Sequence, residues 1–472
     1  YQKLGTDEHP YPFADHGTVY AVGDLNCDGT AKSGETTYSN TNTSTRDPHQ
    51  FDHGACAKCD EFDPDYLKPD ADNYYTLASD ADLYWFVRLC NMKGNNNANA
   101  RLTADINYTH QARLGDELNY MGVFDGQNHT VKFEFSSDAD KLAFIKNMED
   151  ATVKNLLLKG DIYSTTHFSA GVVSEAYGKS VIKNVVSEVN ITSMYEGDAT
   201  HGGLVAVGHQ NLQIENCAYN GKLYAPYAIG TGGIMGWSGD GSQASIKHCY
   251  VGGELVLKAG SENVVIARNN PYIEDCWVSS VNEEKYGENV YTTYYDAAGT
   301  ETGELCYKWL NATAVENVYW YQTLGKDLYP VPFADHGTVY VAGAQYCDGT
   351  PKGEATGYSN NPAGDRDPHV FADGFCTHCG GVDMNYKKPG EDGFFAIGSD
   401  DDLYWFALYT KTQDTKNANA KLTADINYTH DEMIGMARCS YGGVFDGQEH
   451  TITVDINRDE AGRAAIFDDV EG

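Results

Sequence analysis

Short apolar segments recur between about residues 140 and 320 at a nearly constant spacing. Each begins with Val or Ile, continues with a polar residue and then Asn, His or Asp, and ends with Leu, Val or Cys. They start 29, 32, 32, 27 and 42 residues apart, and glycine-apolar stretches precede several of them. Such short β-rich segments predict a parallel solenoid, in which each turn of the chain adds one strand to each face. The segments are 153–156, 182–185, 214–217, 246–249, 273–276 and 315–318.

A helical pattern at residues 79–89 precedes the solenoid region. Ser79 is suited to cap its N-terminus, two aspartates favour its positive end, and Leu83 and Phe86 share one face. We expect this helix to close the end of the solenoid, where strand edges would otherwise be exposed. Trp85 and its later counterpart Trp405 are expected in the core of this cap; the alternative is that they stack on glycans.

The chain repeats itself with a period of 320 residues. Residues 12–20 recur as 332–340, 82–86 as 402–406, and 102–110 as 422–430. The chain therefore holds one full unit and the first half of another, and both ends cut through a repeat. We expect a window on a longer tandem array, which the intact mass of the source protein would test. The expected segments are a cysteine/histidine module at 1–75, a capping helix plus β-helix at 76–320, a second module at 321–395 and a truncated second β-helix at 396–472.

Two glycine-rich segments, Gly-Leu-Val-Ala at 203–206 and Gly-Ile-Met-Gly at 233–236, each precede an Ile-x-Asn-Cys-type strand. Together with the phrases at 97–109 and 124–130, this pattern resembles the GLUG-motif repeats of bacterial surface and adhesin-like proteins. The resemblance covers roughly residues 140–320. It implies a right-handed parallel β-helix on a large secreted protein, and it implies no catalytic site.

The main chemical signal is a duplicated set of three cysteines and one histidine with the spacing C-x21-H-x6-C-x2-C. The sets are Cys27, His49, Cys56 and Cys59, and Cys347, His369, Cys376 and Cys379. Three thiolates and one imidazole form a closed tetrahedral zinc site, which is structural because no coordination position stays open. Such a site stabilises a loop-rich module with little core of its own. The predicted fold is therefore mainly β: a small zinc-stabilised module followed by a right-handed parallel β-helix, repeated in tandem.

Other interpretations of the twelve cysteines stay open. Disulfides are permitted in an extracellular chain, but three cysteines per module leave one unpaired, which favours metal; reduced thiols are the third interpretation. His16 or His336 could replace the histidine ligand of its module. Cys217, Cys249 and Cys276 occupy equivalent positions on successive turns, and we expect a stack of buried thiols inside the solenoid.

Two weaker signals concern the surface. Asp24, Asn26, Asp28 and Glu35 match the spacing of a calcium-binding EF-hand loop. The second copy lacks two of these ligands and no flanking helices are evident, so a polar turn is the alternative. Glycosylation sequons matter only if the source glycosylates exported proteins. They occur at Asn42, Asn107, Asn128, Asn190, Asn311 and Asn427.

The net charge of the chain argues against two classes of binding partner. Lys and Arg total 33 and Asp and Glu total 68, giving a net charge of −35, which argues against nucleic acid and against an anionic membrane surface. No apolar run approaches 18 residues, so no membrane insertion is expected in this segment.

These signals predict an extracellular, cell-surface structural protein: a fibre, stalk or adhesin shaft without catalytic activity. The expected partners are further copies of the same repeat, by self-association or in tandem. A carbohydrate-binding adhesin module is the main alternative. A β-helix polysaccharide-degrading enzyme is a further one, which needs paired carboxylates in a groove. The duplicated aspartates Asp105 and Asp125 are better explained as turn residues.

Overall fold

The structure is a computed structural model of the 472-residue chain. It describes all residues except 35, 240, 259–261, 270, 283–291, 312–317, 342–344, 351, 353–356, 362–366, 437–438, 455–464 and 472. The chain forms two compact units, Tyr1–Val339 and Tyr340–Gly472. The first unit therefore includes residues 321–339, which by the sequence repeat belong to the second copy.

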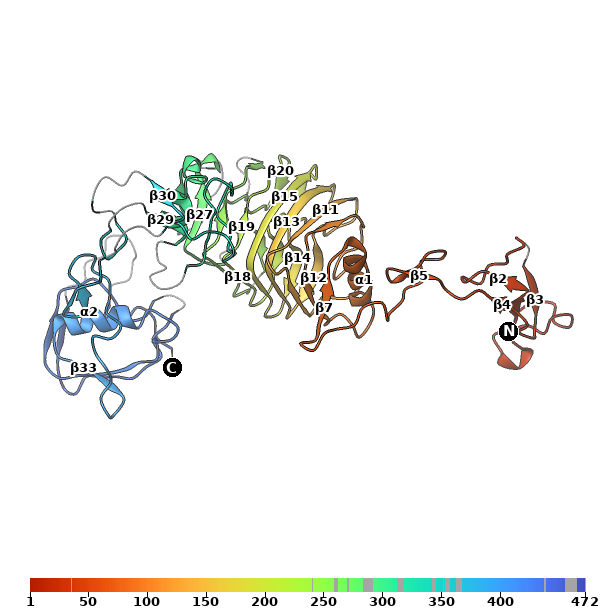
Figure 1. The fold of residues 1–472 in the computed structure, drawn as a ribbon. Helices are drawn as coiled ribbons and strands as arrows, with labels where there is room; N and C mark the ends of the chain where they lie inside the picture. Colours follow the sequence, from red (N-terminus) through yellow and green to blue (C-terminus); the bar gives the residue numbers. More distant parts are fainter. Residues whose placement is uncertain are drawn as a thin grey trace. The chain divides into compact units, whose positions relative to one another are not determined.

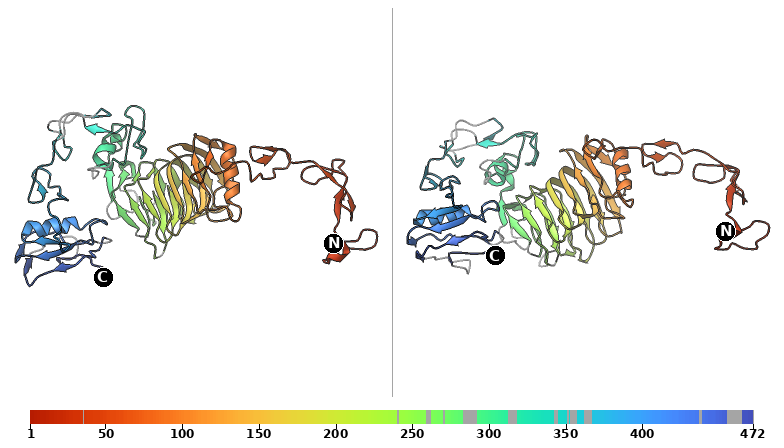
Figure 2. Two further views of the ribbon diagram at one scale, coloured as in Figure 1. Left: turned by 60° about the horizontal axis from the view of Figure 1, so that its bottom comes forward. Right: turned by 90° about the horizontal axis from the view of Figure 1, so that it is seen from below.

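The first unit contains a β-solenoid of parallel strands stacked turn on turn, which confirms the predicted fold (Figures 1 and 2). Nine strands form the longest hydrogen-bonded path of its 16-stranded sheet. They are β7 (Tyr74–Leu77), β8 (Asn99–Leu102), β10 (Val123–Asp125), β13 (Thr152–Ser164), β15 (Val181–Ser193), β19 (Ala218–Tyr219), β24 (Tyr250–Val251), β27 (Cys276–Ser279) and β28 (Thr292–Tyr295). The other strands of this sheet are β9 (Ile106–Tyr108), β11 (Thr130–Ser137), β18 (Gln213–Glu215), β20 (Leu223–Ala225), β23 (Ser245–Lys247), β25 (Leu255–Leu257) and β26 (Tyr272–Glu274).

A separate parallel sheet forms another face of the same turns. It consists of β12 (Ile145–Glu149), β14 (Val173–Tyr177), β17 (Val205–Gly208) and β22 (Met235–Ser238). A small pair, β16 (Gly197–Asp198) and β21 (Ala228–Ile229), lies beside two of the turns. The apolar side chains between these faces form one continuous core from Leu77 to Val278.

The strand register follows the sequence motif. The first apolar residue of each segment pairs with its counterpart on the next turn, from Val153 through Ile182, Ile214 and Ile246 to Ile273. All five side chains are buried, because the register places them on the inner face. The segment at 315–318 lies largely outside the described residues.

The third residue of each segment has a left-handed backbone, with φ near +50° at Asn155, Asn184, Asn216, His248 and Asp275. Asn, Asp and His tolerate this conformation better than other side chains do, which explains the motif. The amides also form a ladder: Asn184 donates to Asn155 Oδ1 at 3.0 Å, and Asn216 donates to Asn184 Oδ1 at 3.2 Å. Each turn thus fixes the corner of the next.

The glycines that precede several strands lie where successive turns approach closely. A Cβ on Gly203 would lie 2.1 Å from the carbonyl oxygen of Gly233, and one on Gly233 would lie 2.1 Å from that of Val265. Any side chain at these corners would push neighbouring turns apart.

The predicted helix is present as α1 (Asp80–Cys90), and the Ser79 side chain accepts a hydrogen bond from Asp82 N, as expected for an N-cap. The helix lies beyond β7 at the end of the stack (Figures 1 and 2), and Leu83 and Phe86 contribute to the solenoid core. The helix thus lies where the sequence predicts a cap.

The segments outside the solenoid are short and loop-rich. The N-terminal module contains β1 (Tyr20–Val22), β2 (Asp24–Leu25), β3 (Thr37–Ser39), β4 (Thr45–Arg46), β5 (Phe51–Asp52) and β6 (Ala55–Cys56). Single-turn 3-10 helices are η1 (Ala14–His16), η2 (Ser280–Asn282) and η3 (Ala297–Gly299), and η4 (Leu305–Leu310) is a short π-helix. None of the described helices is long and apolar enough to span a membrane.

The second unit repeats the order of the first. It contains β29 (Tyr340–Val341), β30 (Tyr358–Ser359), β31 (Phe371–Ala372), β32 (Phe375–Cys376), β33 (Phe394–Ile397), α2 (Asp400–Tyr409), β34 (Asn419–Leu422), β35 (Ile426–Tyr428), β36 (Phe445–Asp446) and β37 (Ile452–Val454). β33, β34 and β36 are parallel neighbours, as β7, β8 and β10 are in the first unit. A second solenoid therefore begins here.

The asparagine ladder makes a prediction about stability. Asn184→Ala removes two ladder hydrogen bonds. It also places alanine, which tolerates a left-handed backbone less well than asparagine does, at φ +54°. We therefore expect the free energy of unfolding to fall by about 2–3 kcal/mol. Asn184→Gly loses the same hydrogen bonds but tolerates the backbone, and should cost about 1 kcal/mol less. Urea unfolding of the full chain measures both, and equal effects would contradict the conformational part of this account.

Candidate metal centres

The predicted cysteine and histidine residues of the first module converge on one point. The Sγ atom of Cys27 lies 3.6 Å from those of both Cys56 and Cys59, and Cys59 Sγ lies 3.4 Å from His49 Nδ1. All four ligand atoms lie within 4.8 Å of one another, so the group can hold a metal ion.

These separations fit tetrahedral zinc. With Zn–S bonds of about 2.3 Å and Zn–N bonds of about 2.0–2.1 Å, the edges of the tetrahedron are about 3.5–3.8 Å long. A disulfide needs sulfurs only about 2.05 Å apart. Cys27, Cys56 and Cys59 are free thiols in the structure, so the arrangement favours the metal interpretation over disulfides.

The second module builds the same group. Cys347 Sγ lies 3.4 Å from Cys376 Sγ, and Cys379 Sγ lies 3.4 Å from His369 Nδ1. The four ligand atoms again lie within 4.8 Å of one another. Two copies with different surrounding sequences thus keep the same donor set and geometry.

In each group, the surroundings lower the pKa of one cysteine and so favour its thiolate form. Hydrogen bonds led by the backbone N–H of Lys58 outweigh burial and lower the pKa of Cys56 to about 5. Burial and the neighbouring thiols raise the pKa of Cys27 to about 11. In the second module the N–H of Cys379 has the leading role, and the pKa of Cys376 is about 5. A cation bound here would complete the deprotonation of the set, since metal binding releases protons.

Local folding explains how the two close cysteines are presented. β5 and β6 form an antiparallel hairpin with Phe51 opposite Cys56, and its turn residues His53 and Gly54 both have positive φ. In the second copy Asp373 and Gly374 take the same conformation. His53 is therefore a turn residue and no ligand, as its replacement by Asp373 indicates.

The histidines considered as substitutes lie elsewhere. His16 Nδ1 is 2.9 Å from Asp7 Oδ2, and His336 Nδ1 is 2.7 Å from Asp327 Oδ2. Neither joins the metal-binding group of its module. His49 and His369 are the nitrogen donors of the two sets.

The module is attached to the helical cap through a tryptophan. Trp85 is 1% exposed, and its Nε1 donates to the carbonyl oxygen of Asp63 at 2.6 Å. Phe62 stacks on the indole, and the Tyr66 hydroxyl donates to Asp82 Oδ1 at 2.7 Å. The polypeptide just after the Cys56–Cys59 turn is thereby packed against α1.

The second unit repeats this attachment. Trp405, which is fully buried, donates to the carbonyl oxygen of Asp383 at 2.7 Å, and Tyr386 donates to Asp402 Oδ1. The core interpretation of both tryptophans is confirmed. Neither indole is available as a glycan-stacking platform.

The predicted calcium loop forms a local turn. Asp28 Oδ1 accepts hydrogen bonds from the backbone and hydroxyl of Thr30, whose hydroxyl also accepts from Asn26. Glu35 lies outside the described residues. Nothing in the described part of this loop supports calcium.

The sequons differ in their surroundings. The side chains at 42, 107, 190 and 427 are exposed, whereas Asn128 is partly covered and donates to Asp335. Asn311 donates to the carbonyl oxygen of Trp320 at 2.8 Å, so a glycan there would require this hydrogen bond to break. Glycosylation of the chain stays a prediction.

The thiol stack inside the solenoid is confirmed. Cys217, Cys249 and Cys276 are buried and free, and each thiol donates to a backbone carbonyl oxygen. Burial raises the pKa of Cys249 well above its usual range. These thiols fill the core and are poor nucleophiles.

The structure contains a charged cluster that the sequence does not predict. Glu175 on β14 accepts a hydrogen bond from Tyr177 at 2.9 Å, pairs with Lys141, and lies 3.7 Å from His209 Nε2. The His209 ring stacks on Tyr177 with centroids 4.4 Å apart. Lys141 and His209 come from other segments than Glu175 and Tyr177, which share β14, so no local motif marks the whole cluster.

This cluster lacks the properties of an acid–base centre. Burial raises the pKa of Glu175, but His209, Lys141 and Tyr177 outweigh it and lower the value to about 2. A general acid or base needs a pKa near the working pH. Glu175 is ionised at neutral pH and is balanced by Lys141, which is typical of a structural ion pair.

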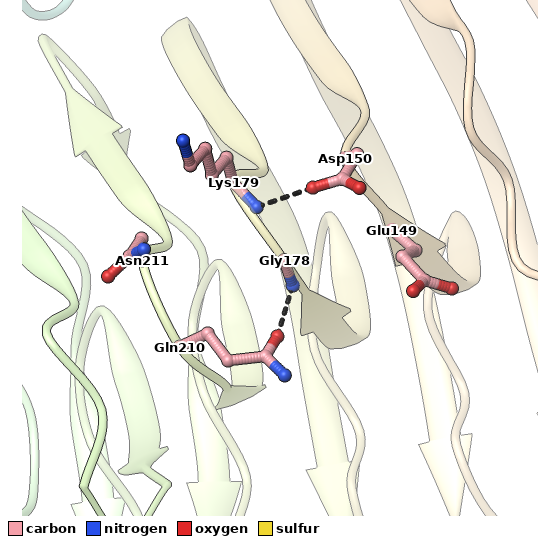
Figure 3. A pocket seen from close by; sticks show the side chains of 6 residues that line it. All are labelled: Glu149, Asp150, Gly178, Lys179, Gln210 and Asn211. Atoms are coloured by element: carbon pink, nitrogen blue, oxygen red, sulfur yellow. Dashed lines mark hydrogen bonds between the residues drawn. The ribbon is translucent and has the colours of Figure 1, made fainter.

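A shallow hollow on the solenoid also places two carboxylates side by side. Figure 3 shows Glu149, Asp150, Gly178, Lys179, Gln210 and Asn211 around it. Asp150 accepts from the backbone of Lys179 at 2.8 Å, Gln210 accepts from that of Gly178, and Glu149 accepts from Asn119 at 3.0 Å. Its polar groups therefore join neighbouring turns.

Comparisons with known proteins give little guidance. No family model matches the chain, and no curated protein matches it at a significant level. Among solved structures, it is similar to the crystal structure of a candidate immunoglobulin A1 protease from Bacteroides ovatus, with 18% sequence identity and a TM-score of 0.43. The match covers 56% of this chain and 93% of that chain. At this distance the likeness carries no argument about function.

The metal centres predict a stoichiometry. The chain purified without chelator should contain two equivalents of zinc by elemental analysis. Cys56→Ser and Cys376→Ser should each lower the content to one, and the double variant should contain none. Cys217→Ser is the matched control and should keep both. A metal-free protein whose mass is lowered by the hydrogens of paired thiols would contradict the assignment.

The Glu175 cluster predicts a pH dependence. Because the folded-state pKa lies below the ordinary value of 4.5, the ionised carboxylate stabilises the fold above pH 4.5, and this contribution is lost as the pH falls towards 2. Glu175→Gln should cost about 2 kcal/mol at pH 6, and the difference from wild type should shrink towards pH 2. Urea unfolding across this range measures it; a constant difference would contradict the ion-pair account.

Proposed function

We propose that this chain is part of an extracellular, non-catalytic structural protein built from tandem repeats. The unit consists of a zinc-stabilised module, a helical cap and a β-solenoid. In such a protein the solenoid provides length, and the module and cap form the junction between successive solenoids.

The observation that carries this proposal is the repetition of the junction. In both units a Cys₃His group and a hairpin turn precede the first parallel strand, and a buried tryptophan bonded to a loop carbonyl follows that strand. In a repeat array, each unit contacts its neighbours through the same interface. A junction that recurs with the same contacts is therefore expected in a tandem-repeat protein. The resemblance to GLUG-motif surface proteins points in the same direction.

The chemistry of the described residues also supports a non-catalytic role. The metal-binding groups have four protein ligands each, so a bound zinc ion has no open position for substrate. Glu175 and the carboxylates of the hollow are engaged by neighbouring turns. Each feature stabilises the fold, and none is poised for proton transfer.

The location and form of the protein test the proposal. Antibodies against the 472-residue chain should label intact cells of the source organism as strongly as permeabilised cells. Electron microscopy of shed material should show extended particles. Antigen confined to the cell interior, or turnover of a polysaccharide by the purified chain, would overturn it. A glycan array tests the carbohydrate-binding alternative.

A further inference from the structure

The chain contains two versions of one short segment, residues 1–20 and 321–340, with identical residues at 15 of 20 positions. They also share one local fold. Gln2 N donates to Gly17 O at 2.8 Å, and Gln322 N donates to Gly337 O at 2.7 Å. The histidine–aspartate pair of the first segment recurs in the second.

The same fold has opposite exposure in the two places. Phe13 is 58% exposed, whereas its counterpart Phe333 is 2% exposed. Pro10 and Pro12 are exposed, while the equivalent residues 330 and 332 are buried. Local structure is constant, so the difference arises from what lies against the segment.

The flank of the first solenoid covers the second segment. The Tyr250 hydroxyl of β24 donates to the carbonyl oxygen of Pro330 at 2.8 Å, and Trp320 packs edge-on against Tyr250 with centroids 5.0 Å apart. At the edge of this contact, Asn128 donates to Asp335 Oδ1 at 3.0 Å. These residues lie within the first compact unit, so the segment belongs structurally to the solenoid that precedes it.

We propose that residues 1–19 are a docking segment whose partner is the solenoid of another copy of the 320-residue unit. They bind the flank that Tyr250 and Trp320 mark in this chain, with Phe13 in the place of Phe333. That flank of the present chain is already occupied by residues 321–339, so the partner is a further copy. The inference rests on the proposed tandem-repeat function and specifies its joint.

The identity of the exposed residues supports this partner. Pro10, Pro12 and Phe13 are exposed in the first segment and buried in the second, and all three are unchanged between the two segments. Apolar side chains exposed together mark an interaction surface. The counterpart segment, residues 321–339, already packs the same side chains against the flank of a solenoid.

The test adds most of one repeat unit to the 472-residue chain. Residues 20–320 are placed directly before Tyr1, which recreates the Trp320–Tyr321 junction and leaves residues 1–19 present once. Hydrogen exchange of residues 1–19 should slow at least about tenfold relative to the 472-residue chain. Phe13→Asp should restore fast exchange in the extended chain and change nothing in the 472-residue chain. Phe333→Asp is the matched control and should expose residues 321–339 in both chains.

The outcomes separate the two proposals. An extended chain that folds and binds three zinc equivalents, but whose residues 1–19 still exchange as fast as before, overturns the docking segment and leaves the tandem-repeat function standing. An extended chain whose added unit neither folds nor binds metal overturns both.

Discussion

A parallel strand satisfies its backbone hydrogen bonds only when another turn lies on each side, so the ends of a solenoid need cover. At the first end, α1 supplies that cover and turns its apolar face into the core. Trp85 of this helix would be exposed without further cover. Its indole nitrogen donates to the carbonyl oxygen of Asp63, in the loop after the Cys56–Cys59 turn. The open edge of one sheet thus requires the helix, and the helix requires the module.

The module has too little apolar interior to hold itself in this place. Its strands between β1 and β5 are mostly exposed, and its buried apolar residues are little more than Leu25 and the cysteines. A metal ion bound by this group would join the distant Cys27 to the Cys56–Cys59 turn and close a long loop, and its binding energy would become folding energy. The candidate metal centre therefore belongs structurally to the cap of the solenoid.

The features that the sequence reveals are those with local signatures. Each turn needs a buried residue and a left-handed corner, so Ile182 and Asn184 mark the register directly, and ligand spacing marks the metal centres. The Glu175 cluster gathers side chains from several turns and leaves no local trace. Phe13 and Phe333 occur in identical phrases but in different surroundings, so only the structure separates them. The sequence therefore predicts features that depend on residue type, and it does not predict features that depend on which segments lie around a residue.

The net charge of −35 does not oppose the stacking of turns. The polar second position of the motif, together with its counterparts on earlier turns, forms a column in which opposite charges mostly face each other. In stacking order the column is Arg101, Asp125, Lys154, Lys183, Glu215, Lys247 and Glu274. Such partly exposed pairs contribute less than about 1 kcal/mol each, but a register slip would break them. The excess carboxylates lie outside this column, where they repel other acidic surfaces. Nonspecific side-by-side association is therefore disfavoured.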